Sequence, residues 1–230
     1  MLAFKNIKMI FDYNSVLENI SGEFTPGKFI AVTGKNGSGK TTLIRILAGL
    51  QKPTAGQVYF YNKNVFDISV KRLAELRSYI PSNSLCHWDL YIEDIIKLGL
   101  LKSKESKAEK HLKVHNILSD LGLVEFKGRK INTLSSGEKA MVYLARALIS
   151  NPDYIFGDEI LSNLHQDNQH KIMRYLKTLA AKGKAVILIT HNMDMAKEYC
   201  DSIYNLDSGQ SLNTLHCRYG QFGNTVIYKK

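Results

Sequence analysis

The chain has 230 residues, of which 44% are hydrophobic, and a formal net charge of +10. This size suits one well-cored domain with an inserted subdomain, and the lack of an apolar run of ~18 residues excludes a membrane-spanning helix. Residues 1–14 lack the apolar core of a signal peptide, so we expect a cytoplasmic protein. An odd and widely spaced set of cysteines argues against a disulfide framework. These cysteines are Cys86, Cys200 and Cys217.

The positive charge is concentrated in residues 97–130, where nine lysines and arginines stand against four acidic residues. A nucleic acid, an anionic membrane surface or a polyphosphate ligand could each account for a basic chain. The segment shows no interleaving of aromatic and basic residues of the kind that stacks nucleic-acid bases. We therefore interpret it as a solvated helix face and expect no nucleic-acid partner.

Apolar periodicity predicts three elements within residues 28–62. Residues 28–33 (KFIAVT) predict a short buried strand, and residues 56–62 (GQVYFYN) predict another. Between them, residues 40–50 (KTTLIRILAGL) carry apolar side chains at helical spacing. Gly49 and Pro53 predict where this helix ends.

The middle of the chain has a helical pattern and contains no proline between Pro81 and Pro152. One predicted helix has an apolar face, and residues 139–149 (KAMVYLARALI) predict a second helix. The residues of the first face are Leu112, Ile117, Leu118 and Leu121.

Two apolar runs follow, residues 153–157 (DYIFG) and 185–190 (AVILIT), which predict buried parallel strands. An amphipathic helix closed by Gly183 lies between them. Strand–helix–strand units at both ends of the chain predict an α/β fold with a mostly parallel sheet flanked by helices, interrupted by a helical insert.

Residues 34–42 (GKNGSGKTT) follow the first predicted strand and open the helix after it. They match the phosphate-binding pattern G-x-x-x-x-G-K-[ST] in its confirming context. Glycines let the backbone turn so that its N–H groups converge on phosphate oxygens, and the helix N-terminus adds positive potential. We expect Lys40 to reach the β- and γ-phosphates and the Thr41 hydroxyl to hold Mg²⁺. The predicted nucleotide-binding residues are Gly34, Lys35, Asn36, Gly37, Ser38, Gly39, Lys40, Thr41 and Thr42.

Two adjacent carboxylates, Asp158 and Glu159, end the apolar run at residues 153–157. Asp158 can hold Mg²⁺ beside the phosphate loop, and Glu159 can polarise an attacking water as a general base. His191 follows the last strand, where it can donate a hydrogen bond to a γ-phosphate. Gly157 is unexpected, because a bulky apolar residue would pack better at that position.

Residues 134–148 (LSSGEKAMVYLARAL) resemble the LSGGQ signature of ABC-type ATPases. The order of the motifs, from an aromatic residue through the phosphate loop, YIPS, LSSGE, YIFGDE and ITHN, is similar to that of a complete ABC nucleotide-binding domain over residues 2–210. The resemblance implies that the chain binds and hydrolyses ATP with Mg²⁺, that Tyr13 stacks on adenine, and that Lys40, Glu159 and His191 are catalytic. It also implies that the signature contacts the ATP of a partner subunit through Ser135, Ser136, Gly137 and Glu138.

The resemblance further implies a P-loop NTPase core formed by residues 1–81 and 152–230, with an antiparallel β portion near the N-terminus. Residues 82–151 would form a helical signature subdomain. Members of the family form head-to-tail dimers and bind integral membrane permeases, so the chain would lie peripherally on the inner face of the cell membrane.

Two stretches point to a subgroup. Residues 91–100 (YIEDIIKLGL) and 191–201 (HNMDMAKEYCD) resemble ATPases of iron–siderophore, haem and cobalamin importers. The leading hypothesis is therefore an importer ATPase of that kind. An exporter ATPase, or a soluble or degenerate ABC ATPase not coupled to transport, is the alternative.

The sequence departs from the family pattern at three positions. Ser82 replaces the Q-loop glutamine and would reach Mg²⁺ only through a water molecule. His165 replaces the D-loop aspartate, and Ser136 replaces the first signature glycine. The first two departures favour slow or loosely coupled hydrolysis and are the basis of the degenerate alternative.

Overall fold

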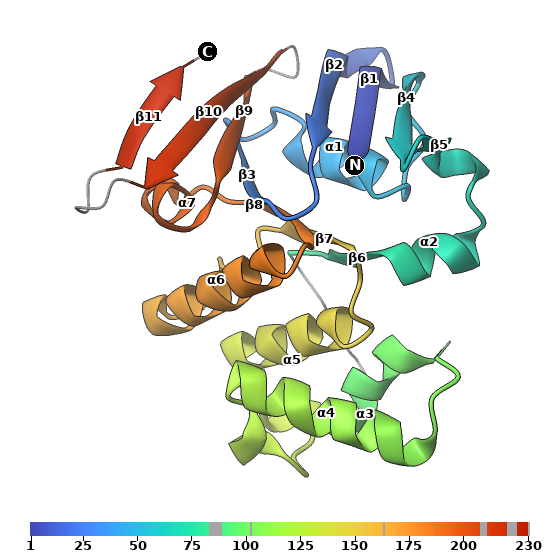
Figure 1. Ribbon diagram of the computed structural model, residues 1–230, viewed down its shortest axis with the longest axis vertical. Coiled ribbons are helices and arrows are strands. Elements are labelled where there is room, and N and C mark those ends of the chain that lie inside the picture. The colour runs from blue at the N-terminus through green and yellow to red at the C-terminus, as the bar shows by residue number, and fades with distance from the viewer. Residues whose placement is uncertain (83–88, 102, 163, 208–210, 220–224, 230) are drawn as a thin grey trace.

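The computed structural model describes residues 1–82, 89–101, 103–162, 164–207, 211–219 and 225–229, the last two segments as backbone only. Figure 1 shows two sheets together in one half of the molecule and a group of helices in the other half. A four-stranded antiparallel sheet has the order β2-β1-β4-β5. Its strands are β1 (Leu2–Phe11), β2 (Asn14–Phe24), β4 (Ala55–Phe60) and β5 (Lys63–Asn64).

The antiparallel sheet confirms the β portion expected near the N-terminus. In β1 the side chains of Leu2 and Phe4 are buried on the core face, as the two-residue period of a strand requires. At Asn6, whose φ is 51°, the register with β2 shifts, and the buried positions continue as Ile7 and Met9. Such a bulge changes which residues face the core without ending the strand.

A seven-stranded sheet has the order β11-β10-β9-β3-β8-β7-β6. The pairs β9–β3, β3–β8, β8–β7 and β7–β6 are parallel, and β10 pairs antiparallel with β9 and β11. The three strands predicted near residues 28, 153 and 185 are confirmed as β3, β7 and β8. The strands are β3 (Phe29–Thr33), β6 (Arg77–Ile80), β7 (Tyr154–Asp158), β8 (Ala185–Ile189), β9 (Ser202–Asp207), β10 (Ser211–Tyr219) and β11 (Thr225–Lys229).

Both faces of the parallel strands are covered, because alternate side chains of β3 enter two different cores. Phe29 and Ala31 pack in a cluster with helices α6 (Gln166–Ala181) and α7 (Met193–Tyr199). Ile30 and Val32 pack in a second cluster with α1 (Lys40–Leu47) and the antiparallel sheet. Continuous apolar runs are therefore required in these strands.

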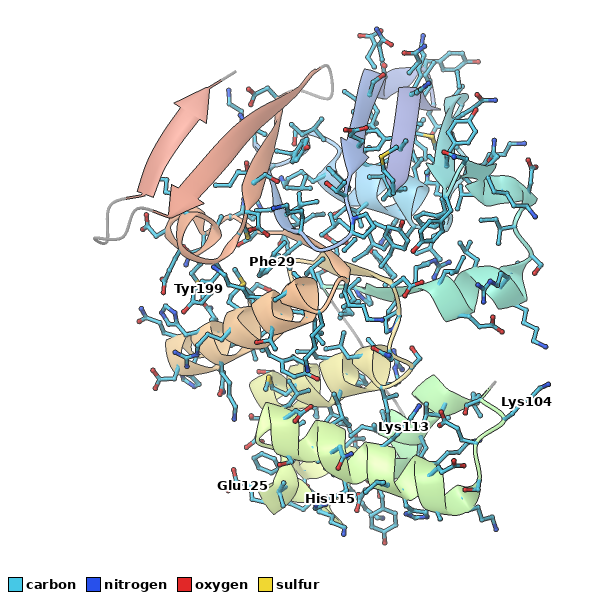
Figure 2. The ribbon with its side chains drawn as sticks, viewed as in Figure 1. Phe29, Lys104, Lys113, His115, Glu125 and Tyr199 are labelled. Atoms are coloured by element: carbon cyan, nitrogen blue, oxygen red, sulfur yellow. The ribbon has the colours of Figure 1, made fainter. Side chains whose placement is uncertain are left out.

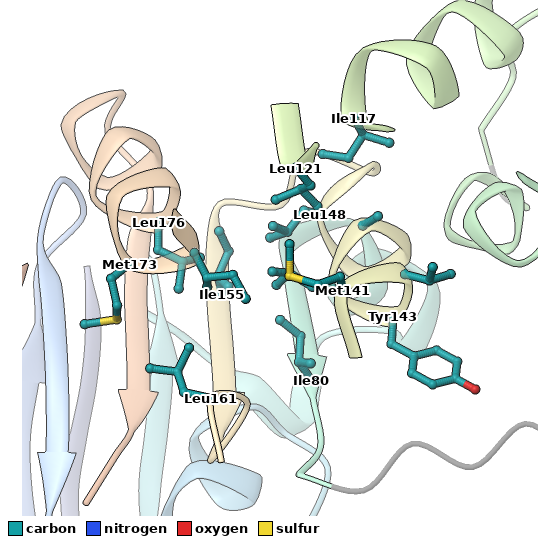
Figure 3. Close-up of a cluster of buried hydrophobic side chains, with 14 of the residues drawn as sticks. Ile80, Ile117, Leu121, Met141, Tyr143, Leu148, Ile155, Leu161, Met173 and Leu176 are labelled. Carbon is teal, nitrogen blue, oxygen red and sulfur yellow. The ribbon is translucent and has the colours of Figure 1, made fainter. Parts of the chain in front are cut away.

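The remaining helices lie mainly in residues 92–148 and share a core with the sheet. Figure 3 shows Ile117 and Leu121 of α4 (Lys107–Leu121) beside α5 (Ser136–Leu148), which is the second predicted helix. Met141 of α5 packs in the same cluster as Ile80 and Ile155 of the sheet. No helix in the described ranges is long and apolar enough to cross a membrane. The helices are α2 (Val70–Leu76), α3 (Ile92–Lys97), α4 (Lys107–Leu121), α5 (Ser136–Leu148) and the short 3₁₀ helices η1 (Val65–Asp67), η2 (Leu98–Leu100), η3 (Val124–Phe126) and η4 (Ile131–Thr133).

The prediction that Leu112 belongs to the apolar face of α4 is wrong. Leu112 has 61% of its surface exposed, whereas Val114 is 3% exposed and joins Ile117, Leu118 and Leu121 in the core. The buried set follows the i, i+3, i+4, i+7 spacing of a helix face, and Leu112 lies outside that face.

Figure 2 labels two lysines of the basic segment, Lys113 on α4 and Lys104 in the loop before this helix. Lys113 forms an ion pair with Glu105, and Lys130 forms one with Asp89. Such exposed pairs contribute little to stability, and they reduce the net positive charge that this surface presents.

Candidate active site

The predicted site segments lie at one edge of the seven-stranded sheet. The strands β6, β7, β8 and β3 run parallel, so their carboxyl ends reach the same edge. The phosphate loop follows β3, Glu159 follows β7, His191 stands two residues after β8, and Ser82 stands two residues after β6. Ligands of open α/β sheets bind in the crevice outside this edge.

The loop between β3 and α1 depends on glycine at three positions with positive φ. These angles are 144° at Gly34, 79° at Gly37 and 86° at Gly39. A Cβ at Gly34 would lie 2.3 Å from the carbonyl oxygen of Leu206, and one at Gly39 would lie 3.0 Å from that of Val16. The loop is thus held closely between β9 and β2 and opens α1 at Lys40.

Two buried polar side chains of the loop fit an anionic ligand. Lys40 is 6% exposed, and its Nζ donates to the carbonyl oxygens of Gly34 at 3.0 Å and Lys35 at 2.8 Å. Burial lowers the pKa of Lys40, against the opposing effect of the nearby carboxylates of Glu159 and Asp158. The hydroxyl of Ser38 is buried without a hydrogen-bond partner in the described structure. An orphaned buried hydroxyl beside converging N–H groups fits a phosphate.

The Asp158 side chain is 2% exposed and receives two hydroxyl donors. Thr41 Oγ1 donates to Asp158 Oδ1 at 3.0 Å, and the hydroxyl of Tyr79 donates to Oδ2 at 2.9 Å. A threonine hydroxyl and a carboxylate oxygen in contact form the ligand set that suits Mg²⁺. Two of the predicted metal-binding residues, Thr41 and Asp158, are thus in contact, whereas Tyr79 is a site residue that the sequence did not indicate.

Glu159 and His191 form a hydrogen-bonded pair, with 3.0 Å between Glu159 Oε1 and His191 Nε2. Glu159 has a φ of 52°, a strained value that a non-glycine residue holds only where its surroundings impose it. Ser162 Oγ donates to the Glu159 carbonyl oxygen at 2.9 Å and stabilises this turn. His191 also lines a pocket of about 230 Å³ together with Gly34, so the histidine lies beside the start of the phosphate loop.

The structure explains why Gly157 precedes the two carboxylates. A Cβ at this position would lie 2.9 Å from Leu188 Cδ1 and 3.2 Å from Ile160 Cδ1. The side chains of the neighbouring strand and of the following turn already fill the space. The expectation that a bulky apolar residue would pack better here is therefore wrong.

The other predicted site residues include Tyr13, the signature and the remaining residues of the phosphate loop. Tyr13 is fully exposed at the tip of the β1–β2 hairpin, with a φ of 69°. Ser135 caps α5 in a reciprocal capping box with Glu138, whose carboxylate accepts from the Ser135 N–H at 2.7 Å. That hydrogen bond lowers the pKa of Glu138. The structure places the rest as follows: Lys35, Asn36, Gly37, Ser82 and His165 are exposed, and Thr42, Ser136 and Gly137 are exposed or half-buried at the starts of their helices.

Comparison with known proteins identifies relatives over almost the whole chain. The ABC transporter family model matches residues 17–162. The arginine transport ATP-binding protein ArtM of Bacillus subtilis (strain 168) is 31% identical over 214 residues, covering 91% of this chain and 88% of that protein. The manganese transport system ATP-binding protein MntB of the same organism is 31% identical over 228 residues, covering 96% and 85%. A relative from onion yellows phytoplasma (strain OY-M) is also 31% identical, but the chain spans 36% of its length.

A solved structure extends this similarity to the fold. A dimeric ATP-binding cassette in a post-hydrolysis state, bound to ADP and Pi, matches with a TM-score of 0.82 at 28% identity. The match covers 91% of this chain and 96% of that one. The chain therefore belongs to the family of ABC transporter ATP-binding proteins, ATPases that use ATP with Mg²⁺ and pair with membrane permeases.

Proposed function

We propose that this chain binds Mg–ATP at residues 34–42 and hydrolyses it to power an importer. The observation that carries the proposal is the meeting of three groups at one sheet edge. These groups are the buried Lys40 in the glycine loop, the Thr41–Asp158 contact and the Glu159–His191 pair. A phosphate grip, a metal site and a base are the parts that ATP hydrolysis requires.

In this proposal the loop binds the phosphates through its N–H groups and Lys40, and the Ser38 hydroxyl contributes a further donor. Lys40 exchanges its present carbonyl partners for the β- and γ-phosphates. Thr41 and Asp158 hold Mg²⁺, with Ser82 reaching it through water. The metal, when bound, neutralises charge on the β- and γ-phosphate oxygens.

Glu159 acts as the general base for the attacking water. Its carboxylate lies at the end of β7 beyond Asp158, with its side chain 36% exposed, so that a water molecule can reach it. The hydrogen bond from His191 fixes the direction of this carboxylate. A base must be oriented before its proton affinity matters. The Glu159–His191 hydrogen bond provides that orientation, and the one N–H of a neutral imidazole serves either this contact or a γ-phosphate.

The signature and Tyr13 act on nucleotide from other parts of the chain. The N-terminus of the 13-residue helix α5 combines positive potential with the Ser135 hydroxyl, and Ser136, Gly137 and Glu138 form its first turn. We propose that this end of α5 closes on ATP held by a second copy, and that Tyr13 stacks on adenine. Residues 82–151 would form a helical subdomain beside a core of residues 1–81 and 152–230.

The importer assignment draws on relatives that are described as import ATP-binding proteins, for methionine and for aliphatic sulfonates. The arginine and manganese relatives are described as transport proteins. We propose that the chain lies in the cytoplasm against an importer permease. Two relatives of equal identity with different cargoes do not select a cargo. The iron–siderophore, haem or cobalamin type therefore remains a prediction from residues 91–100 and 191–201.

ATP-dependent dimerisation of the Glu159→Gln variant tests the proposal. The mass of the eluted protein is measured by light scattering after gel filtration with Mg–ATP. The variant should bind ATP without hydrolysing it and should elute as a dimer, because the signature closes on trapped nucleotide. Lys40→Ala in the same background is the control and should remain monomeric.

A monomer under all conditions, despite ATP binding by Glu159→Gln, would contradict the homodimeric form of the proposal. It would favour a second candidate function, a degenerate subunit that pairs with a different ATPase chain. Ser82 and His165, both exposed and both at positions where the family pattern differs, are the observations that favour this candidate.

A further inference from the structure

Tyr79 contacts the predicted metal-binding carboxylate from a neighbouring strand. Tyr79 lies in β6, which pairs parallel with β7 so that Tyr79 is opposite Phe156. Its hydroxyl donates to Asp158 Oδ2 at 2.9 Å, while Thr41 donates to Oδ1 at 3.0 Å. The two oxygens of the buried carboxylate are therefore held by two different side chains on two different elements.

The Tyr79 hydroxyl is itself oriented by a third side chain. Arg45, on α1, donates through Nε to the Tyr79 oxygen at 3.3 Å. A hydroxyl has one donor hydrogen and accepts at its lone pairs, so the arginine contact leaves the hydrogen directed at Asp158.

We propose that Tyr79 is a positioning residue for the metal site, holding Asp158 Oδ2 so that Oδ1 is presented beside Thr41. This inference rests on the proposed function, in which Mg²⁺ is held by Thr41 and Asp158. The Thr41 hydroxyl can serve the metal only by giving up its hydrogen bond to Oδ1. Among the residues that the structure describes, Tyr79 is then the side chain that still donates a hydrogen bond to the Asp158 carboxylate. A carboxylate offers about four acceptor sites, so the anchor does not block the metal.

The Tyr79→Phe variant tests the proposal because it removes only the hydroxyl. The ring packs against the core cluster that contains α1, and phenylalanine keeps that packing. Tyr175→Phe is a matched control. The Tyr175 hydroxyl also donates to a carboxylate, Asp120 Oδ2 at 3.3 Å, but between helices α6 and α4.

The measurement is binding of a fluorescent ADP analogue to the full chain, first in EDTA and then during titration with Mg²⁺. In Tyr79→Phe the affinity in EDTA should match the wild type, while the Mg²⁺ concentration for half-saturation should rise about tenfold, as expected for a lost hydrogen bond to a charged group. Tyr175→Phe should match the wild type in both conditions. Arg45→Gln should raise the Mg²⁺ concentration for half-saturation about threefold, because it leaves the Tyr79 hydroxyl less well oriented but does not remove it.

An unchanged Mg²⁺ half-saturation in Tyr79→Phe and Arg45→Gln would overturn the inference. Equal weakening in EDTA and in Mg²⁺ would overturn it too, because that pattern reports damage to the phosphate loop rather than to the metal ligand. Wild-type protein that binds no fluorescent ADP in either condition would overturn the proposed function, and this inference with it. Melting temperatures without nucleotide show whether each variant is folded.

Discussion

Replacing Gly34 by alanine should damage the phosphate loop far more than the same change at Gly37. Both glycines belong to the loop and both have positive φ, 144° at Gly34 and 79° at Gly37. They differ in the space around them. A Cβ at Gly34 would lie 2.3 Å from the Leu206 carbonyl oxygen, whereas one at Gly37 would have nothing within 4 Å.

The expected magnitudes follow from this difference. At Gly37 the left-handed conformation costs about 1–2 kcal/mol, partly offset by the reduced entropy of the unfolded chain, about 0.4–1 kcal/mol. The net loss is therefore about 1 kcal/mol. At Gly34 a strain of about 1–3 kcal/mol adds to a clash with backbone that belongs to β9 and cannot rotate away. We expect a total of about 3 kcal/mol or more.

Thermal unfolding of the two variants and the wild type, without nucleotide, is the assay. For a chain of this length 1 kcal/mol shifts Tm by about 2–4 °C. Gly37→Ala should therefore lower Tm by about 2–4 °C and Gly34→Ala by about 6–12 °C or more. Equal shifts in the two variants would refute the reasoning, because both share the backbone strain and only Gly34→Ala meets the carbonyl oxygen.

Four further changes have defined outcomes. Gly157→Leu should lower the free energy of unfolding by about 1–3 kcal/mol through overpacking. Chemical denaturation measures this change, and an unchanged midpoint would show that neighbouring side chains can move to make room. Ser135→Ala should lower Tm by about 2–4 °C through loss of a helix cap of about 1 kcal/mol. Glu138→Gln should leave Tm unchanged because glutamine can complete the same capping box, so an equal fall in both variants would argue against the cap. Ser82→Gln should raise the steady-state ATPase rate, since a longer amide reaches the metal without a bridging water; a lower or equal rate would mean that the site has adapted to serine.

The strands that position the site could be predicted because their signals are local. The buried runs that became β3, β7 and β8 are continuous, and each ends in a chemically distinct group. Once these strands are parallel, Gly34, Asp158 and His191 must reach one edge of the sheet. The positions of the phosphate loop, Asp158 and His191 follow from that alone.

Contacts between strands could not be predicted in the same way. The hydrogen bond from Tyr79 to Asp158 joins residues separated by 79 positions and depends on β6 lying beside β7. The apolar pattern of residues 77–80 does not indicate which strand pairs with β6. The side chain that fills the space beside Gly157 likewise belongs to Leu188, on another strand.

The buried positions of β1 and α4 could not be read from hydrophobicity alone. The bulge at Asn6 moves the alternation of β1 out of phase, so Phe4 and Ile7 are both buried although three positions separate them. In α4, Leu112 is apolar but lies two residues before the buried Val114, about 200° away around the helix. Hydrophobicity alone did not distinguish the core face from the exposed one.

The central claim is that this chain hydrolyses ATP with Glu159 as the base. Steady-state ATPase activity of the purified chain with Mg²⁺, measured over a range of protein concentrations beside Glu159→Gln, tests it most directly. We expect activity that rises steeply with protein concentration, because two copies complete each site, and that disappears in the variant. Turnover by Glu159→Gln at the wild-type rate would contradict it.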